Sequence, residues 1–202
     1  MVEELKAELP VLNLLRQLFL KEPSRELLEG IGQIDSIEDG EIQGLQRMRD
    51  SVRRNNDRIV EWADQLSLEF ARLFIGPVHP PAVPYASFYL SETRSLMTEE
   101  TLDVRKRYLE AGLALKDLYQ IPDDHISSEL EFLYFLTREA IQSMEEGRNE
   151  EPSKFLAMRN DFLKEHMALW LPGFVEKIIQ SSNEDFYKGA AILLREFVDA
   201  YR

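Results

Sequence analysis

A chain whose apolar residues mostly recur at helical spacing is interrupted by four prolines within eight residues: Pro77, Pro80, Pro81 and Pro84. Proline fixes φ and has no backbone N–H, so neither an α-helix nor a central β-strand continues through this stretch. Gly76, immediately before it, can adopt the positive φ that often ends a helix. A solvated linker would be polar, so we expect an ordered loop that packs on the protein. The apolar residues around the prolines are Phe74, Ile75, Val78, Val83, Tyr85, Phe88 and Tyr89.

The rest of the sequence predicts α-helices, because no stretch shows the alternation of a β-strand or the Asn-Gly turn of a hairpin. We therefore predict an all-α fold: a single-domain multi-helix bundle over residues 1–202 that carries the proline-rich aromatic loop. The clearest helix follows Pro122, where apolar residues recur once per helical turn. Asp123 or Asp124 is expected to cap this helix.

Other residues predict where helices begin and break. Pro10 predicts a break or kink in a first helix over residues 2–20, and Pro172 predicts that a later helix kinks or divides. Ser36 and Asp39 resemble a capping box at the start of a further helix.

A helix from Asn55 to Phe74 is expected to lead into the proline-rich loop, and another is expected from Thr98 to near Tyr119. The first of these has apolar residues along one side, which predicts a buried face. That side carries Ile59, Trp62, Ala63, Leu66, Phe70 and Leu73.

The charge of the chain limits its partners. A formal net charge of −13 disfavours nucleic acid and anionic lipid, because both require a concentrated field of lysine and arginine. Residues 120–151 hold nine carboxylates and only two arginines. This stretch is either a solvated acidic face or a surface for a cationic ligand.

Composition also bears on the compartment. The chain has no cysteine, which excludes disulfides and thiolate chemistry and agrees with a reducing compartment. The longest apolar run, residues 167–175, contains Pro172 and Gly173 and is too short to span a bilayer. We expect a cytoplasmic protein without stable membrane insertion.

The histidines are the candidates for metal binding or catalysis. His125 and Glu129 stand one helical turn apart, and His79 and His166 could complete a ligand set. However, the His-Glu-x-x-His spacing, the Gly-x-Ser-x-Gly turn and glycine-rich phosphate loops are all absent from the sequence. We therefore expect no metal, no cofactor and no catalytic residue. Residues 122–125 also allow a purely structural interpretation. In it, Pro122 ends one helix, an aspartate caps the next, and His125 is exposed.

Two aromatic pairs allow two interpretations. His166 and Trp170 share one helix face just before Pro172, and they either pack in the core or form the wall of a ligand groove. The same alternatives apply to Trp62 and Phe70.

Three motifs occur in order along the chain. The first, in residues 69–90, is Glu-x-x-Arg-Leu-Phe-x-Gly-Pro followed by Pro-x-x-Pro-Tyr-x-Ser. The second, in residues 122–130, is Pro-Asp-Asp-His leading into Glu-Leu. The third, in residues 162–174, is Phe-Leu-x-x-His-x-x-x-Trp-x-Pro-x-Phe. Together they resemble the TorD/DmsD family of redox-enzyme maturation chaperones, which belongs with the nitrate reductase delta subunit type of assembly protein. The chain departs from many relatives in lacking a glycine soon after Gly-Pro, and in having Ala86 where they have a glutamate.

The resemblance implies an all-helical, non-catalytic cytoplasmic chaperone. Its partners would be the twin-arginine leader and the folded body of a molybdopterin-containing oxidoreductase precursor, which it would hold until the cofactor is inserted and export can begin. The residues that match leader-binding positions of the family are Leu73, Phe74, Pro84, Tyr85, Ser87, Asp124 and His125.

A twin-arginine leader combines two guanidinium groups with an apolar segment, so its receptor requires an apolar groove with carboxylates at one end. We expect Phe74 and Tyr85 to line the apolar floor and Asp124, beside His125, to meet an arginine. Two alternatives stay open: a helical enzyme or small-ligand protein that uses His125 and His166, or a permanent subunit of a mature complex. The sequence does not specify the client, the oligomeric state, or whether guanine nucleotide or molybdenum cofactor is bound.

Overall fold

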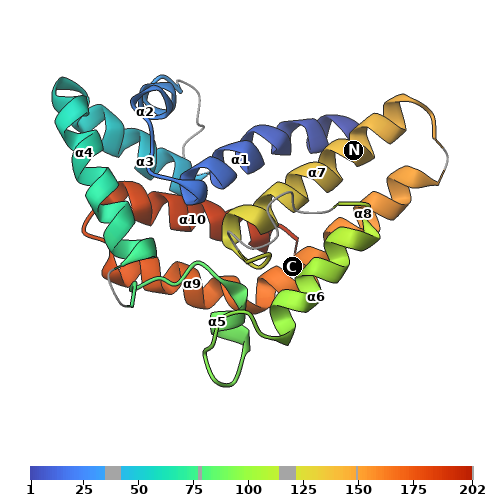
Figure 1. Cartoon of the computed structure of the whole chain (residues 1–202). Helices are drawn as coiled ribbons and strands as arrows, with labels where there is room; N and C mark the ends of the chain where they lie inside the picture. Colours follow the sequence, from blue (N-terminus) through green and yellow to red (C-terminus); the bar gives the residue numbers. More distant parts are fainter. Residues whose placement is uncertain (35–41, 77–78, 114–121, 149, 202) are drawn as a thin grey trace. The chain divides into compact units, whose positions relative to one another are not determined.

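The computed structural model describes residues 1–34, 42–76, 79–113, 122–148 and 150–201 (Figure 1). Among these residues it contains helices and one isolated β-bridge but no strand, which confirms the all-α prediction. Ser36 and Asp39 lie outside the described residues. The elements are α1 (Val2–Leu20), α2 (Arg25–Gly32), α3 (Gln43–Arg54), η1 (Asn56–Arg58), α4 (Ile59–Phe70), η2 (Ala71–Ile75), α5 (Ala86–Leu90), α6 (Glu99–Glu110), α7 (Ile126–Glu145), α8 (Glu151–Phe162), η3 (Leu163–Met167), α9 (Ala168–Ser181) and α10 (Asp185–Asp199).

The chain forms two compact units, each built from segments that are far apart in the sequence. Unit 1 contains the described residues of Met1–Leu20, Tyr85–Trp170 and Tyr201–Arg202, and unit 2 contains those of Lys21–Pro84 and Leu171–Ala200. The chain therefore passes from unit 2 to unit 1 within the predicted loop, between Pro84 and Tyr85. The expectation of a single domain stays a prediction.

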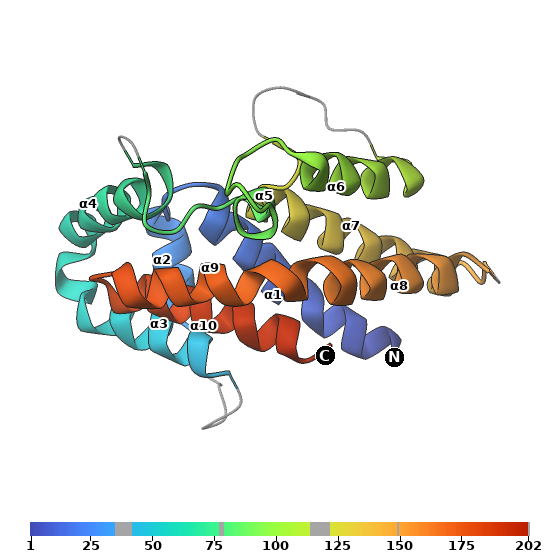
Figure 2. The ribbon, with the colours of Figure 1, turned by 90° about the horizontal axis from the view of Figure 1, so that it is seen from below.

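In unit 1, α1 and α8 both pack against α7 (Figures 1 and 2). The helix α1 continues through Pro10, so the expected break is wrong. Proline removes one helical hydrogen bond, but burial of the α1 leucines offsets this cost because each contributes roughly 1.5–3 kcal/mol. The buried residues of α1 are Leu5, Leu12, Leu15, Leu18 and Phe19.

In unit 2, α3 lies along α10 at very close range (Figure 2). A Cβ atom added to Gly44 would lie 2.2 Å from the backbone N of Leu193, so only glycine fits there. The carboxylate of Glu196 accepts hydrogen bonds from the backbone N–H groups of Gln43 (2.9 Å) and Gly44 (3.1 Å) at the start of α3. It thus satisfies two N–H groups that a helix start leaves unpaired.

Two further helix expectations, the division at Pro172 and the end near Tyr119, differ from the structure. The helix α9 runs unbroken across Pro172, so this proline does not divide it. The helix α6 ends at Glu110, well before the expected Tyr119, because Gly112 follows in a turn with φ of 80°. Glycine adopts this left-handed conformation readily, and it commonly ends helices.

Candidate functional site

The predicted loop begins with a tight turn at Gly76. After the π-helical turn η2, the backbone N–H of Gly76 donates to the carbonyl of Ala71 at 2.7 Å, and φ reaches 54°. A Cβ atom here would lie 2.9 Å from the backbone N of Pro80. The positive φ expected for Gly76 is therefore confirmed, and the close approach of Pro80 adds a second reason for glycine. π-Helical turns often mark functional segments.

The unit 2 side of the loop is buried. Leu73 and Phe74 are both enclosed, and the Phe74 ring lies 5.0 Å from the Phe70 ring, 6.0 Å from that of Phe174 and 5.9 Å from that of Tyr187. The loop returns to η2, since the backbone N–H of Ala82 donates to the carbonyl of Leu73 at 3.0 Å. These side chains hold the loop to unit 2 by packing.

Pro84 and Trp62 are also buried in unit 2. The indole N–H of Trp62 donates to Glu184 at 3.2 Å, and its ring packs edge-on against Phe186. Trp62 and Phe70 therefore occupy core positions in this conformation.

The unit 1 side of the loop pairs with the start of α7. Tyr85 and His125 form an antiparallel β-bridge, and the backbone N–H of Ala86 donates to the carbonyl of Asp124 at 3.0 Å. The Tyr85 and His125 rings meet edge to face with centroids 5.0 Å apart. The structure thus brings Tyr85, Ser87, Asp124 and His125 together, although two motifs far apart in the sequence supply them.

Asp124 is the central residue of this contact. Its Oδ2 atom accepts a hydrogen bond from the backbone N–H of Ser87 at 2.8 Å, and its Oδ1 atom accepts one from the Thr101 hydroxyl at 3.0 Å. Its exposed fraction is 0 %. In this conformation Asp124 therefore joins α5, α6 and α7 and does not reach a ligand directly.

Asp123 is also engaged inside unit 1. Its carboxylate accepts hydrogen bonds from Nε (2.9 Å) and Nη2 (2.6 Å) of Arg105, and its backbone carbonyl accepts one from the Tyr108 hydroxyl at 2.8 Å. Burial, with further contributions from Glu129, Asp123 and Asp124, raises the pKa of Tyr108 well above its ordinary value. Arg105 therefore partly neutralises the negative charge of the aspartates that precede α7.

His125, not Asp123 or Asp124, caps α7, so the expected cap is wrong. Its Nδ1 atom accepts a hydrogen bond from the backbone N–H of Ser127 at 3.1 Å. Both aspartate side chains point elsewhere because Ser87, Thr101 and Arg105 bind them. His125 is buried, and burial lowers its pKa to about 4 against the opposing effect of Asp124. The ring is therefore neutral at pH 7, as an acceptor at Nδ1 requires.

His166 and Trp170 share one buried partner, Glu129. Nε2 of His166 lies 2.6 Å from one carboxylate oxygen of Glu129, and the Trp170 indole N–H donates to the other at 3.1 Å. Burial raises the pKa of Glu129, although the interaction with His166 opposes this shift. All three side chains are core residues here. Within the described part of the chain, no group of three or more histidine or acidic side chains is arranged to hold a metal ion.

Sequence reasoning missed two residues of this site. Thr101 and Arg105 bind the two aspartates from α6, but a threonine and an arginine on an amphipathic helix give no signal of such a role. In contrast, the one-turn spacing of His166 and Trp170 predicted a shared helix face, and of the two interpretations given for it the structure shows packing in the core.

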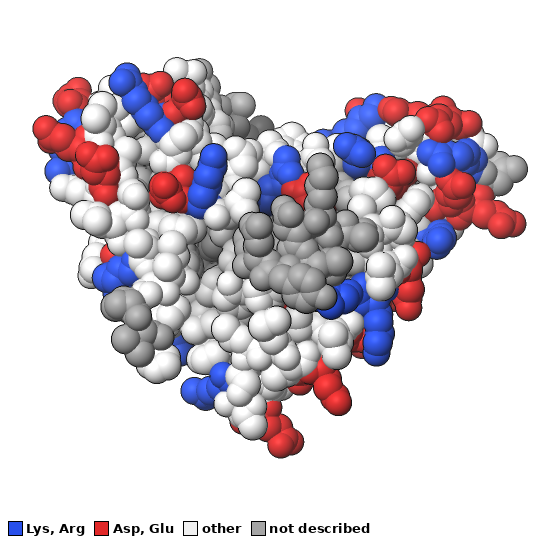
Figure 3. Space-filling model, in the orientation of Figure 1, with Lys and Arg blue, Asp and Glu red and all other residues white. Residues whose placement is uncertain are grey.

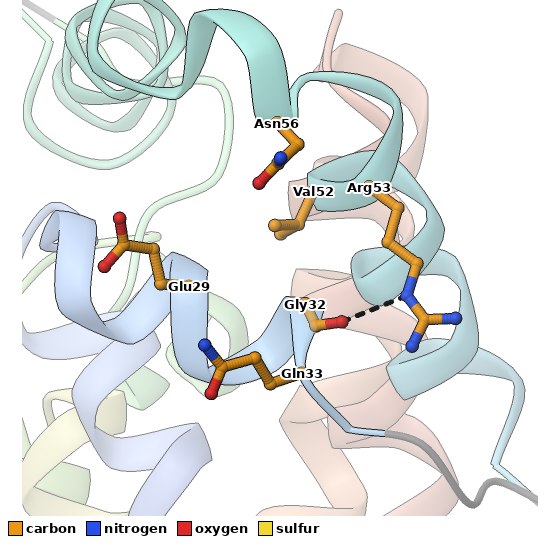
Figure 4. Close-up of a pocket in the computed structure, with 6 residues that line it drawn as sticks. All are labelled: Glu29, Gly32, Gln33, Val52, Arg53 and Asn56. Atoms are coloured by element: carbon orange, nitrogen blue, oxygen red, sulfur yellow. Dashed lines mark hydrogen bonds between the residues drawn. The ribbon is translucent and has the colours of Figure 1, made fainter.

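A cavity of about 420 Å³ lies in unit 2 between α2 and the end of α3 (Figure 4). Its wall includes the Arg53 guanidinium, whose Nε donates to the carbonyl of Gly32 at 3.0 Å. None of the predicted site residues lines it. The lining residues are Glu29, Gly32, Gln33, Val52, Arg53 and Asn56.

The helices within the described ranges include none with the length and apolar character needed to cross a membrane.

The sequence was compared with family profiles and with known proteins. The sequence profile described as nitrate reductase delta subunit matches residues 40–176, which is more than half of the chain. Three similar proteins are each named chaperone protein TorD. They come from Vibrio parahaemolyticus (29 % identical, 86 % of this chain and 77 % of that protein), Aliivibrio fischeri (28 %, 86 % and 77 %) and Vibrio cholerae (27 %, 86 % and 75 %).

Proposed function

Because the chain belongs to the nitrate reductase delta subunit family, we propose that it is a maturation chaperone for a molybdopterin-containing oxidoreductase. In this role it binds the twin-arginine leader of the precursor in the cytoplasm, contacts the folded body, and holds the precursor until its cofactor is inserted. The name chaperone protein TorD, shared by the similar proteins, supports the non-enzymatic role.

The observation that carries the proposal is the direct bonding of two motif segments in unit 1. The stretch Tyr85–Ser87 is bound along its backbone to Asp124 and His125. A recognition surface requires such fixed geometry, because ordering a loop during binding costs affinity. The Ser87 hydroxyl is buried and has no hydrogen-bond partner among the described residues.

The structure supports different roles for the proposed leader-binding residues. Tyr85 is partly exposed, so it can contact a peptide directly. Asp124 is fully buried, so we assign it the positioning of Tyr85 and Ser87 in place of the expected contact with an arginine. Leu73, Phe74 and Pro84 shape the loop from unit 2.

The test is a pull-down with the tagged chain from its native cytoplasm, followed by mass spectrometry. We expect one large molybdoenzyme precursor that still carries its leader, and no mature enzyme. Capture of the mature enzyme alone would favour a permanent subunit, and absence of any oxidoreductase would contradict the proposal. A Tyr85→Ala chain is expected to capture less precursor, whereas Tyr134→Ala, on α7, serves as a control for loss of a partly exposed tyrosine.

A further inference from the structure

The cavity in unit 2 between α2 and the end of α3 contains none of the residues used in the proposed function (Figure 4). One wall is formed by Glu29, Gly32 and Gln33 at the end of α2, and the side chains of Val52 and Asn56 point towards this wall from α3 and η1. The volume of about 420 Å³ falls within the range of roughly 300–1,000 Å³ that small-molecule sites usually have. The groups that line the cavity therefore indicate which kind of ligand fits.

The fold itself holds the two walls in place. A Cβ atom added to Gly32 would lie 2.9 Å from Cγ1 of Val52, so any larger residue would displace this buried valine. Arg53 also joins the walls, because its Nε and Nη2 atoms donate to the carbonyls of Gly32 at 3.0 Å and Ile34 at 3.1 Å. A ligand would therefore enter a cavity that is already formed, which lowers the cost of ordering the protein during binding.

Oxygen acceptors are the main polar groups of the lining. Within the described residues, Oε1 of Glu29 accepts a hydrogen bond from Nε of Arg25 at 2.7 Å, and Oε2 has no partner. The side-chain carboxamides of Gln33 and Asn56 also form no hydrogen bond with the described part of the chain. Each carboxamide has one acceptor oxygen, so three oxygens from three side chains remain available to a ligand.

The occupied oxygen of Glu29 distinguishes between cations. A guanidinium group pairs best with both oxygens of a carboxylate at once, and Arg25 already holds one of them. A primary ammonium is a point charge with three N–H donors, so it can donate to three separate oxygens. A quaternary ammonium has no N–H donor and is usually bound by aromatic rings, which are absent from the six lining residues. The lining therefore favours a primary ammonium.

The surrounding charge limits the ligand to a single small charge. Acidic and basic side chains lie side by side over α2, at the upper left of Figure 3, so no continuous field of one sign covers this helix. Among the lining residues, a phosphate group would be repelled by Glu29, and a divalent metal ion would find only this one carboxylate. The charge of Arg53 is partly offset by the carbonyls at the end of α2 to which it donates.

We propose that this cavity binds a small primary alkylamine in its ammonium form. The ammonium group donates to the oxygens of Glu29, Gln33 and Asn56, and the alkyl chain lies against Val52, the only apolar side chain of the lining. This site lies outside the proposed function, so its presence or absence does not bear on the chaperone role.

The experiment titrates n-butylammonium chloride into the purified full-length chain, labelled with ¹⁵N, and follows the amide signals by NMR. We expect saturable shifts of the side-chain signals of Gln33 and Asn56, with a dissociation constant of about 1 mM, which is typical of a ligand this small. Sodium chloride and tetramethylammonium chloride at the same concentration are the reference salts. Neither should produce saturable shifts at these residues.

The variant Glu29→Gln keeps the size of the side chain and removes its charge. It should weaken binding of n-butylammonium about threefold to tenfold. Glu26→Gln, which removes an exposed carboxylate from the same helix outside the cavity, should bind as the wild type does. The pair Gln33→Ala with Asn56→Ala should also weaken binding, whereas Gln65→Ala on α4 should not. Circular dichroism checks that all variants keep their helical content.

Four results would overturn the proposal. The first is the absence of any saturable shift with n-butylammonium. The second is the same shifts with tetramethylammonium or sodium, because binding would then not need N–H donors. The third is an equal loss of affinity in Glu29→Gln and Glu26→Gln, which would indicate an effect of net charge. The fourth is tighter binding of n-propylguanidinium than of n-butylammonium, which would contradict the role of the occupied Glu29 oxygen.

Discussion

The Oδ2 atom of Asp124 accepts a hydrogen bond from the backbone N–H of Ser87 at 2.8 Å, across 37 positions of sequence. The other oxygen of the same carboxylate binds Thr101 on α6. One buried side chain thus binds both α5 and α6, the helices on either side of the connecting segment. The site depends on this carboxylate for its shape.

Replacing Asp124 with alanine should therefore destabilise the protein. It leaves the Ser87 N–H and the Thr101 hydroxyl buried without a partner, so we expect a loss of about 2–4 kcal/mol in the free energy of unfolding. Urea denaturation followed by circular dichroism measures this loss. As a control, Asp103→Ala removes an exposed aspartate that pairs with Arg107, and it should cost no more than about 0.5 kcal/mol. Equal effects of the two substitutions would contradict the bridging role.

Acid should destabilise the fold through His125. Its pKa falls from 6.5 in the unfolded chain to about 4 in the folded one, so the folded state binds fewer protons between these values. Stability is then full above pH 6.5 and is lost as the pH falls toward 4, by about 3 kcal/mol.

The variant His125→Asn isolates this effect, because asparagine is also a strong helix cap but does not titrate. The pKa of Asp185 is lowered, mainly by its hydrogen bond with Arg47, so Asp185 also makes acid destabilising, but at lower pH. This contribution is the same in the wild type and in the variant. The measurement is therefore the difference in unfolding free energy between wild type and variant from pH 7 to pH 4. A difference that stays constant over this range would disprove the assigned role of His125.

The crossing of α3 and α10 should not tolerate a larger residue. In Gly44→Ala the new Cβ meets the backbone of Leu193, so the helices must separate, and we expect a loss of about 1–3 kcal/mol. Gly30→Ala in α2 is the matched control, since nothing lies within 4 Å of its added Cβ. Alanine favours helices, so this control should gain roughly 0.5–1 kcal/mol. Thermal unfolding of both variants checks the opposite signs.

Glu129 should be essential for the core of unit 1. Glu129→Ala leaves His166 and the Trp170 indole without their buried partner, and we expect a loss of about 3–5 kcal/mol. Glu129→Gln retains an oxygen that can accept from Trp170, so its loss should be smaller, about 1–2 kcal/mol. Denaturant titration monitored by tryptophan fluorescence measures both. The core assignment is wrong if the alanine variant is as stable as the wild type.

The sequence predicted the fold class and most helices because periodicity and helix ends are local properties. Gly76, for example, takes the positive φ that the turn requires. Pro10 and Pro172 do not break their helices, since burial of surrounding apolar residues outweighs the local cost of proline. Whether a helix continues through a proline depends on its tertiary contacts, and these cannot be inferred from a single sequence.

The candidate site was predictable in part. The resemblance of the motifs indicated Tyr85, Ser87, Asp124 and His125 as candidate site residues. In the structure these four residues lie together in unit 1. The exposure of each side chain was not predictable, because it depends on partners such as Thr101 and Arg105 that come from another helix. For this reason Asp124 looked like a surface carboxylate in the sequence but is a buried connector in the structure.

The central claim is that the chain recognises a peptide with an arginine pair beside an apolar segment. Isothermal titration of the purified chain with the leader of the captured precursor, and with the same leader carrying Gln-Gln in place of Arg-Arg, tests it most directly. We predict saturable 1:1 binding of the native leader and at least about tenfold weaker binding of the glutamine version, because two charge-assisted contacts are lost. Equal affinities for the two leaders, or no binding of either, would contradict the account.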